Sequence, residues 1–272
     1  MFAKIKHVAI VTDDCERLGA FYRAVFQLRG EVSEEGKRFR KSTRRAVAVT
    51  DGNIGLNFNL RKPGRPASLD HFGVEVEDVE RVFQRLRDRY PGIETLSRPG
   101  GRAFAGLSTH DPAGNVFDLS QEGMANRTSV YNETGDGPQK RFIHHLNLRV
   151  VDPDAIARFY QDVYEFEPVP SRDGNTHLTD GAVTLIIAPW KLGDFLGTGI
   201  ERPKLDHIGF KVESLEAVQR DVDGLSRREP SAGARVIADD AEGEARLKLL
   251  AQCGYGARHF ADPDGTLIDI AE

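Results

Sequence analysis

The stretch Leu205-Asp-His-Ile-Gly-Phe-Lys-Val-Glu213 decides the architecture, because the chain contains it twice. The earlier copy is Leu69-Asp-His-Phe-Gly-Val-Glu-Val-Glu77, and looser copies begin at Ile5 and Ile143. Each copy places a histidine near the start of a segment with alternating apolar residues, which is the pattern of a strand. A unit that recurs along a chain indicates a repeated fold. Four such strands therefore open four modules.

Each opening strand is followed by a helical pattern and then by three strand-like segments, so each module is predicted to be βαβββ. The predicted helices span residues 15–26, 79–90, 154–163 and 215–225, and an inserted segment at 242–252 also has near-helical spacing. The strand-like segments include one near 30–38 and one near 235–238, and residues 190–203 are expected to be a connector. Asp-Pro-x-Gly turns at 111–114 and 262–265 precede the last strands of modules two and four.

The sequence therefore predicts an α+β protein of two tandem domains, each made of two βαβββ modules. The 272 residues exceed the size of one typical domain. Residues 1–122 form the first predicted domain and residues 141–272 the second. The polar segment 123–140, with Gly, Asn, Asp and Pro, is expected to be the linker.

Composition limits the classes of partner. Hydrophobic residues make up 39% and charged residues 29%, as in ordinary globular proteins, and the net charge is −5. This charge does not favour nucleic acid or an anionic membrane. No apolar run is long enough to cross a bilayer, and the first residues lack the apolar core of a signal peptide, so we expect a cytoplasmic protein. The local basic cluster 37–45 is expected to be a solvated surface, with an anionic partner as the alternative.

Strand alternation places the histidines on one face of each sheet. In all four opening strands the apolar residues share a face, which must pack on the helices. His7, His71, His145 and His207 then lie on the other face, whereas His144 is expected to point with the helix-packing side. The same rule places Asp118 and Asp269 of the closing strands on the histidine face.

Each half thus offers two imidazoles and one carboxylate on one face. Two histidines and a carboxylate with open positions suit Fe(II), and Mn, Ni or Zn are compatible. The alternative is that a buried histidine and aspartate satisfy each other's hydrogen bonds. Cys15 and Cys253 are the only cysteines, and their spacing resembles neither a metal site nor a disulfide framework.

With these motifs, the chain resembles the vicinal oxygen chelate superfamily, which includes glyoxalase I, type I extradiol dioxygenases, methylmalonyl-CoA epimerase and bleomycin-resistance proteins. The resemblance covers nearly the whole chain. It implies that the two modules of each half curl into a curved mixed sheet, a cup with helices outside that holds a divalent metal. By position, the implied ligands are His7, His71 and Asp118 in the first half and His145, His207 and Asp269 in the second.

The resemblance also distinguishes the halves. Glyoxalase-like members place a fourth ligand, usually Glu or Gln, where this chain has Asn57 in the first half and Ile186 in the second. The second half therefore looks like the three-ligand dioxygenase arrangement. His259 stands where extradiol dioxygenases often have a tyrosine, and it could act as acid and base. Both closing-strand ligands here are Asp where the family usually has Glu. Separately, Tyr255 in the inserted segment could belong to a lid or anchor a loop.

We therefore expect an Fe(II)-dependent ring-cleavage dioxygenase that acts at the second set on a small molecule with vicinal oxygens. One alternative is a glyoxalase- or epimerase-like activity at the first set, where a metal would act as a Lewis acid. Another is a metal-free protein that binds a small molecule. The family resemblance also implies that two chains can pair as a homodimer.

Overall fold

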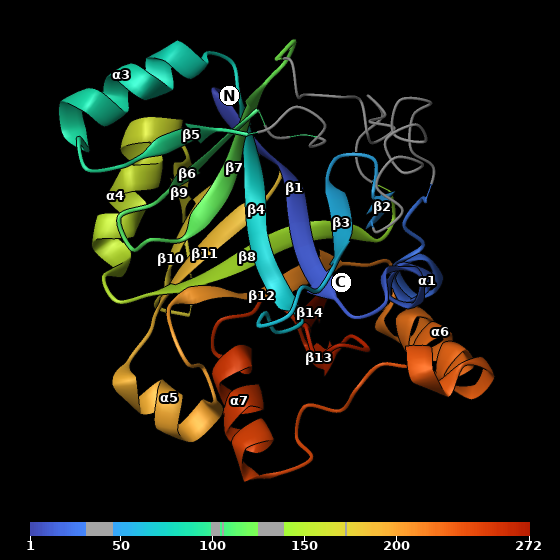
Figure 1. Ribbon diagram of the computed structural model, residues 1–272. Helices are drawn as coiled ribbons and strands as arrows, with labels where there is room; N and C mark the ends of the chain where they lie inside the picture. The colour runs from blue at the N-terminus through green and yellow to red at the C-terminus, as the bar shows by residue number, and fades with distance from the viewer. Residues whose placement is uncertain (31–45, 99–103, 105, 125–138, 172) are drawn as a thin grey trace.

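The computed structural model describes residues 1–30, 46–98, 104, 106–124, 139–171 and 173–272, shown in Figure 1. The elements of the first half are β1 (Ala3–Thr12), α1 (Cys15–Phe26), β2 (Ala46–Thr50), β3 (Gly55–Leu60), β4 (Ser68–Val76), α3 (Val79–Arg89), β5 (Thr95–Ser97), β6 (Leu107–His110) and β7 (Val116–Gln121). Those of the second half are β8 (Phe142–Val150), α4 (Pro153–Tyr164), β9 (Glu167–Val169), β10 (Thr176–Thr179), β11 (Thr184–Pro189), α5 (Leu192–Thr198), β12 (Lys204–Lys211), α6 (Leu215–Arg228), η1 (Pro230–Ala232), α7 (Ala241–Ala251), β13 (Arg258–Ala261) and β14 (Leu267–Ala271).

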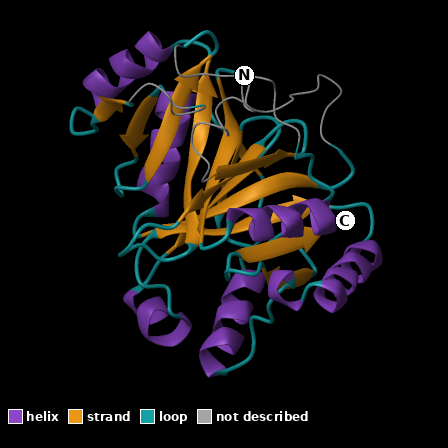
Figure 2. Cartoon of the chain, turned by 45° about the vertical axis from the view of Figure 1, so that its right-hand side comes forward, coloured by secondary structure: helices purple, strands orange, loops and turns teal. Residues whose placement is uncertain are grey.

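The strands form two open mixed sheets with the same plan. The orders are β2-β3-β1-β4-β7-β6-β5 and β13-β14-β12-β8-β11-β10-β9. In each sheet the two opening strands, β1 with β4 and β8 with β12, pair antiparallel at the centre. Each of these four strands also pairs in parallel with the last strand of its module. The predicted α+β architecture, with two modules in each half and helices around the strands, is confirmed (Figure 2).

Local sequence explains where the helices begin. The Asp14 carboxylate accepts hydrogen bonds from the backbone N–H groups of Glu16 and Arg17 and so caps α1. Asp152 caps α4 in the same way, and Pro153 occupies its first turn, where a missing N–H costs no hydrogen bond. The apolar residues at helical spacing are the buried ones in both helices. Helices predicted from that spacing therefore begin and end within a few residues of the observed bounds.

The two halves share one hydrophobic core. Helix α1 lies beside α6 of the other half (Figure 1), and the ring of Phe26 stacks on that of Phe210 with centroids 3.8 Å apart. On the opposite side, Phe117 on β7 packs against Tyr160 and Tyr164 of α4. Burying one such ring contributes about 1.5–3 kcal/mol, so these contacts hold the halves together.

Hydrogen bonds cross between the halves in matched pairs. The hydroxyl of Tyr22 donates to Asp262 at 3.1 Å, and that of Tyr160 donates to Asp111 at 3.4 Å. Both aspartates are the first residues of the Asp-Pro-x-Gly turns, so each turn is tied to the first helix of the other half. The turns need their glycines, because Gly114 and Gly265 have φ of 82° and 97°.

A second matched pair joins the opening strands to turns of the other half. The backbone N–H of Ile5 donates to Asp180 at 2.5 Å, and that of Ile143 donates to Asp51 at 2.9 Å. Asp51 and Asp180 belong to the repeated Thr-Asp-Gly segments. The division into domains 1–122 and 141–272, with a linker at 123–140, stays a prediction.

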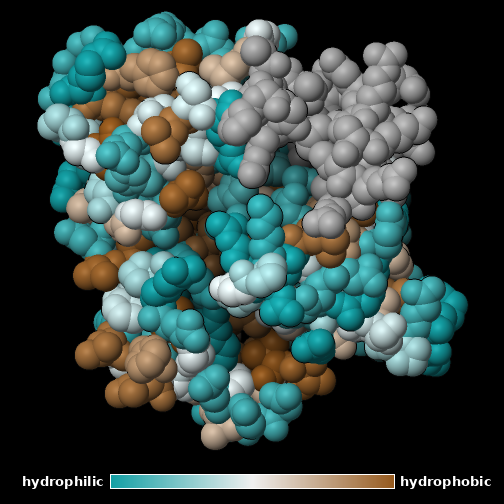
Figure 3. Space-filling view, in the orientation of Figure 1, coloured by the Kyte–Doolittle hydropathy of each residue, from teal (hydrophilic) through white to brown (hydrophobic). Residues whose placement is uncertain are grey.

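The observed secondary structure differs from the predicted one at residues 190–203 and 235–238. The expected connector 190–203 contains helix α5, which exposes Leu192, Phe195 and Leu196 where hydrophobic surface gathers in Figure 3. The expected strand at 235–238 is reduced to a single bridge between Arg235 and Ala261. The expected strand near 30–38, the basic cluster 37–45 and most of the linker lie outside the described residues. None of the described helices is long and apolar enough to span a membrane.

The buried turn carboxylate predicts a pH dependence of stability. Burial raises the pKa of Asp262 to about 6, against the hydrogen bonds that it accepts from the backbone N–H groups of Thr266 and Asp264. Folding therefore favours the protonated form, and the free energy of unfolding falls as pH rises from about 4 through about 6. We expect Asp262→Asn to lack this loss. Between pH 4 and pH 7.5, the free energy of unfolding of this variant, measured with denaturant, should rise by up to about 3 kcal/mol relative to that of the natural protein.

The exposed Asp239 offers a matched control, since Asp239→Asn changes the charge equally. Its stability should differ from that of the natural protein by the same amount at both pH values. If the free energies of unfolding of Asp262→Asn and the natural protein differed by the same amount at both pH values, this role for Asp262 would be contradicted.

Candidate metal centre

Irregular pairing of the opening strands shapes both candidate sites. The register between β1 and β4 slips at Lys6 and again at Asp70, and that between β8 and β12 slips at His144 and at Asp206. A β-bulge of this kind turns a side chain out of strict alternation. Asp70 and Asp206 therefore lie beside the rings of the histidines that follow them, instead of pointing to the opposite face.

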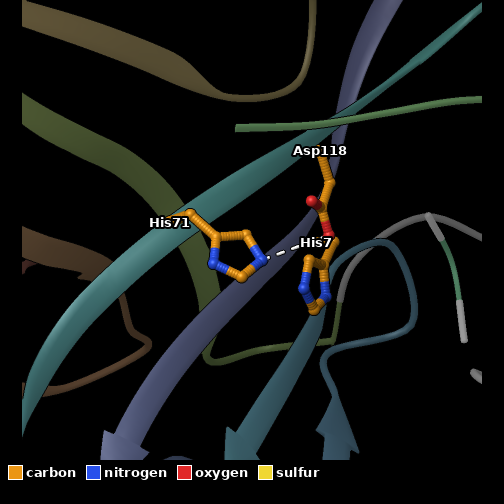
Figure 4. A group of neighbouring side chains, drawn as sticks. All are labelled: His7, His71 and Asp118. Atoms are coloured by element: carbon orange, nitrogen blue, oxygen red, sulfur yellow. Dashed lines mark hydrogen bonds and ion pairs between the residues drawn. The ribbon is translucent and has the colours of Figure 1, made fainter. Parts of the chain in front are cut away.

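The first set consists of His7, His71 and Asp118, whose ligand atoms all lie within 4.8 Å of one another (Figure 4). His71 Nε2 and Asp118 Oδ2 are hydrogen-bonded at 3.1 Å, and His71 Nδ1 bonds Asp70 Oδ2 at 2.8 Å. Both ring nitrogens of His71 thus have carboxylate partners. Burial opposes charge on this ring, but the two carboxylates raise the pKa of His71 to about 9.

Asp118 has further partners. Its Oδ1 forms an ion pair with Arg98 Nη1 and accepts a hydrogen bond from Ser108 Oγ at 3.1 Å. Although burial opposes ionisation, the contacts with His71 and the nearby cations lower the pKa of Asp118 to about 2. A guanidinium group and a protonated imidazole therefore already neutralise the carboxylate of the first set.

The second set consists of His145, His207 and Asp269, and its ligand atoms also lie within 4.8 Å of one another. All three side chains are completely buried. His145 Nε2 lies 3.1 Å from Asp269 Oδ2 without hydrogen-bond geometry. In the part of the chain that the structure describes, His145 Nε2, His207 Nε2 and Asp269 Oδ1 have no hydrogen-bond partner, although His259 Nε2 lies 3.0 Å from Asp269 Oδ1. Buried polar atoms without partners are costly, so three that converge on one point indicate a site for a ligand that they share.

The protonation states suit a cation. Burial lowers the pKa of His145 to about 4, despite the nearby Asp269, so its ring is neutral at pH 7. His207 Nδ1 bonds Asp206 Oδ2 at 3.0 Å, so the other ring nitrogen, Nε2, remains available to the set. Burial opposes charge on Asp269, but its contacts with His145 and His259 hold its pKa below the usual range. Two imidazoles and a carboxylate are a complete facial set.

A buried network holds Asp206 in place behind His207. Arg149 Nε lies 3.2 Å from Asp206 Oδ2, and Arg246 Nη2 from helix α7 lies 2.5 Å from Asp206 Oδ1. Burial opposes its charge, but His207 and the two guanidinium groups hold the pKa of Asp206 well below its usual range. An ionised carboxylate on the far nitrogen of a histidine fixes its tautomer and orientation, as in known metal sites.

A loop covers the second set. The Tyr255 ring lies over His145, with centroids 5.1 Å apart, and its hydroxyl bonds His177 Nδ1 at 2.6 Å. His177 Nε2 in turn bonds Asp173 at 2.9 Å. The backbone N–H of Gly256 donates to Asp269 Oδ2 at 3.0 Å. This loop therefore closes the site and links it to the partly exposed Asp173 through a chain of hydrogen bonds.

The structure brings each set of predicted ligands together. His259 Nε2 lies 3.0 Å from Asp269 Oδ1, next to the second set. Ile186 is buried and offers no ligand, while Asn57 bonds Asn59 at 3.3 Å. The prediction for His144 is wrong: the bulge turns its ring toward the site, with its Nδ1 3.2 Å from His145 Nδ1. Whether either set binds a metal stays a prediction.

Several residues of the site escaped sequence reasoning. Asp70 and Asp206 were visible in the repeated Leu-Asp-His segment, but strict alternation would place them on the face opposite the histidines. Arg98, which pairs with Asp118, and His177, which bonds Tyr255, had no signal in the sequence, because each comes from another part of the same half.

Comparisons with known proteins agree with the fold. Residues 4–119 match the family model described as the Glyoxalase/Bleomycin resistance protein/Dioxygenase superfamily. No curated protein matches the chain in sequence.

Solved structures resemble the whole chain. The Mn(II)-bound glyoxalase from Novosphingobium aromaticivorans is 16% identical, with a TM-score of 0.61 over 99% of this chain and 81% of its own. The 2,3-dioxygenase LapB from Pseudomonas sp. KL28 is 18% identical, with a TM-score of 0.60; the match covers 98% of this chain and 91% of LapB. An extradiol ring-cleaving dioxygenase from B. fuscum is 15% identical, with a TM-score of 0.60; the match covers 99% of this chain and 71% of that enzyme. At these identities the likeness shows a shared fold.

The close fit of the loop to Asp269 gives a testable prediction. A Cβ on Gly256 would lie 2.0 Å from Asp269 Oδ1 and 2.3 Å from the backbone oxygen of Ile270. Gly256→Ala must therefore move the loop, and we expect denaturant unfolding to show a loss of about 1–3 kcal/mol. Gly197→Ala on α5, where a Cβ meets nothing within 4 Å, should be neutral or slightly stabilising. Equal stability of both variants would show that the loop does not pack on Asp269.

Proposed function

We propose that this chain, a member of the Glyoxalase/Bleomycin resistance protein/Dioxygenase superfamily, is a divalent-metal-dependent enzyme whose metal lies in the second half. His145, His207 and Asp269 would hold the ion. The observation that carries this proposal is that their buried ligand atoms lie within 4.8 Å of one another, while His145 Nε2 and His207 Nε2 have no hydrogen-bond partner within the described residues. Fe(II) is the metal that this donor set suits best, with Mn, Ni or Zn as alternatives.

The proposed reaction is extradiol-like ring cleavage of a small molecule with vicinal oxygens. Two supports are the three-ligand set, with Ile186 rather than a ligand at the fourth position, and the overall likeness to LapB and the B. fuscum dioxygenase. A bound iron would supply a Lewis acid for two neighbouring substrate oxygens and a redox partner for O2.

The chain's own residues would position, shield and move protons. Asp206 holds His207 at a fixed orientation, and Tyr255 keeps water away from His145. His259, beside Asp269, would exchange protons near the site, as general acid and base require. The chain from Tyr255 through His177 to Asp173 offers a path for a proton to the surface.

The alternative of a glyoxalase- or epimerase-like activity in the first half has less support. The Mn(II)-bound glyoxalase shares the fold. In this chain, however, Arg98 forms an ion pair with Asp118, and both ring nitrogens of His71 are hydrogen-bonded to carboxylates. A metal there would have to displace a guanidinium group and compete with a proton. A metal-free binding protein is the remaining alternative, and metal analysis distinguishes it from both enzymes.

The direct test is elemental analysis of protein purified without chelator, together with catechol-dependent oxygen uptake. We expect about one iron per chain and oxygen uptake, both abolished in His207→Ala and both retained in His71→Ala. Bound Ni or Zn without oxygen uptake would favour the glyoxalase-like reaction. Equal metal content in the two variants would show that the proposed site is wrong, and no metal in any protein would favour the binding protein.

The two repeated aspartates provide a matched pair of milder variants. Asp206→Asn removes the carboxylate behind His207 without touching a ligand, and we expect metal affinity to fall about 10–100-fold in competition with a chromogenic chelator. Asp70→Asn makes the same change behind His71 and should leave that affinity unchanged. A fall of similar size in both variants would contradict a site confined to the second half.

A further inference from the structure

A cleft of about 530 Å³ lies where the two halves meet, separate from the second set of ligands. One wall comes from the start of β4 and the segment before it, and another from residues 202–205 at the start of β12. The turn 113–116 between β6 and β7 completes it. This volume is in the range of small-molecule sites.

The charge of the cleft is strongly positive. Arg65, Arg202 and Lys204 line it, while the single carboxylate there, Asp70, bonds His71 Nδ1 at 2.8 Å. Among the described residues, no carboxylate forms an ion pair with any of these three cations. Burial and the guanidinium groups of Arg246 and Arg202 lower the pKa of the half-buried Lys204, against the opposing effect of Asp206 and Glu201.

The backbone donors of the turn already have acceptors. The backbone N–H groups of Ala113, Gly114 and Asn115 all donate to Asp111, as does the Asn115 side chain. A ligand in the cleft would therefore meet mainly the three cationic side chains. These can form charge-assisted hydrogen bonds, which are roughly twice as strong as neutral ones.

The internal repeat explains why two arginines meet here. Arg65-Pro66 stands before Leu69-Asp-His71, and Arg202-Pro203 stands before Leu205-Asp-His207. Arg65 of the first half and Arg202 of the second therefore both line one cleft. Lys204 adds a charge that the first half, with Ala67 and Ser68, does not have.

We propose that this cleft binds a small molecule carrying a phosphate or carboxylate group, held by Arg65, Arg202 and Lys204. The ligand would bridge the two halves. This site lies outside the proposed metal centre, and its ligand binding does not require the proposed reaction.

Calorimetric titration with inorganic phosphate and, separately, with succinate tests this proposal at constant ionic strength. We expect at least one of the two anions to bind with a stoichiometry near one, and Arg65→Gln/Arg202→Gln to weaken that binding tenfold or more. Binding of phosphate alone would assign the phosphate class, and binding of succinate alone would assign the carboxylate class.

The control is Arg220→Gln/Arg227→Gln, which removes the same charge from exposed positions of α6, a helix that does not line the cleft. It should bind as the natural protein does. The proposal is overturned if the natural protein binds neither anion, or if the two double variants lose affinity equally. Because the readout is binding, a failure here is distinct from a failure of the proposed metal-dependent activity.

Discussion

The antiparallel pairing of two opening strands at the centre of each sheet is the constraint on which the site depends. It brings two histidines from distant segments to the same face, and the parallel closing strand adds an aspartate. Two bulges in each pair then place Asp70 or Asp206 behind its histidine. In a pair of regular strands these carboxylates would lie on the helix side. The irregular register is therefore what places each of them beside its histidine.

Duplication gave both halves this scaffold, but their surroundings have diverged. In the first half Arg98 and the hydrogen bonds of His71 satisfy the carboxylate of Asp118 from within the protein. In the second half an inserted helix and loop bury the set, and the network of Arg149 and Arg246 acts on Asp206 rather than on the ligands. The carboxylate of the first set is thus neutralised by other side chains, whereas His145 Nε2, His207 Nε2 and Asp269 Oδ1 have no hydrogen-bond partner among the described residues.

Local periodicity was sufficient to predict the repeat, the helix bounds and the face of each ligand. Helix 15–26 and strand 142–150 agree with the observed α1 and β8, because caps and alternation are encoded in neighbouring residues. The bulges could not be predicted, since they arise from cross-strand register, and with them the orientation of His144 was missed. The partners that distinguish the two halves, Arg98 and Arg246, approach from other elements, so short-range patterns carried no trace of them.

We propose that the second half alone holds a metal, at a point shared by two imidazoles and one carboxylate. Anomalous X-ray diffraction at the absorption edge of the bound metal, from crystals of protein purified without chelator, locates that metal. We expect a single anomalous peak per chain within coordination distance, about 2–2.3 Å, of His145 Nε2, His207 Nε2 and Asp269. A peak at His7, His71 and Asp118, or no peak at either set in protein saturated with Fe(II), would contradict it.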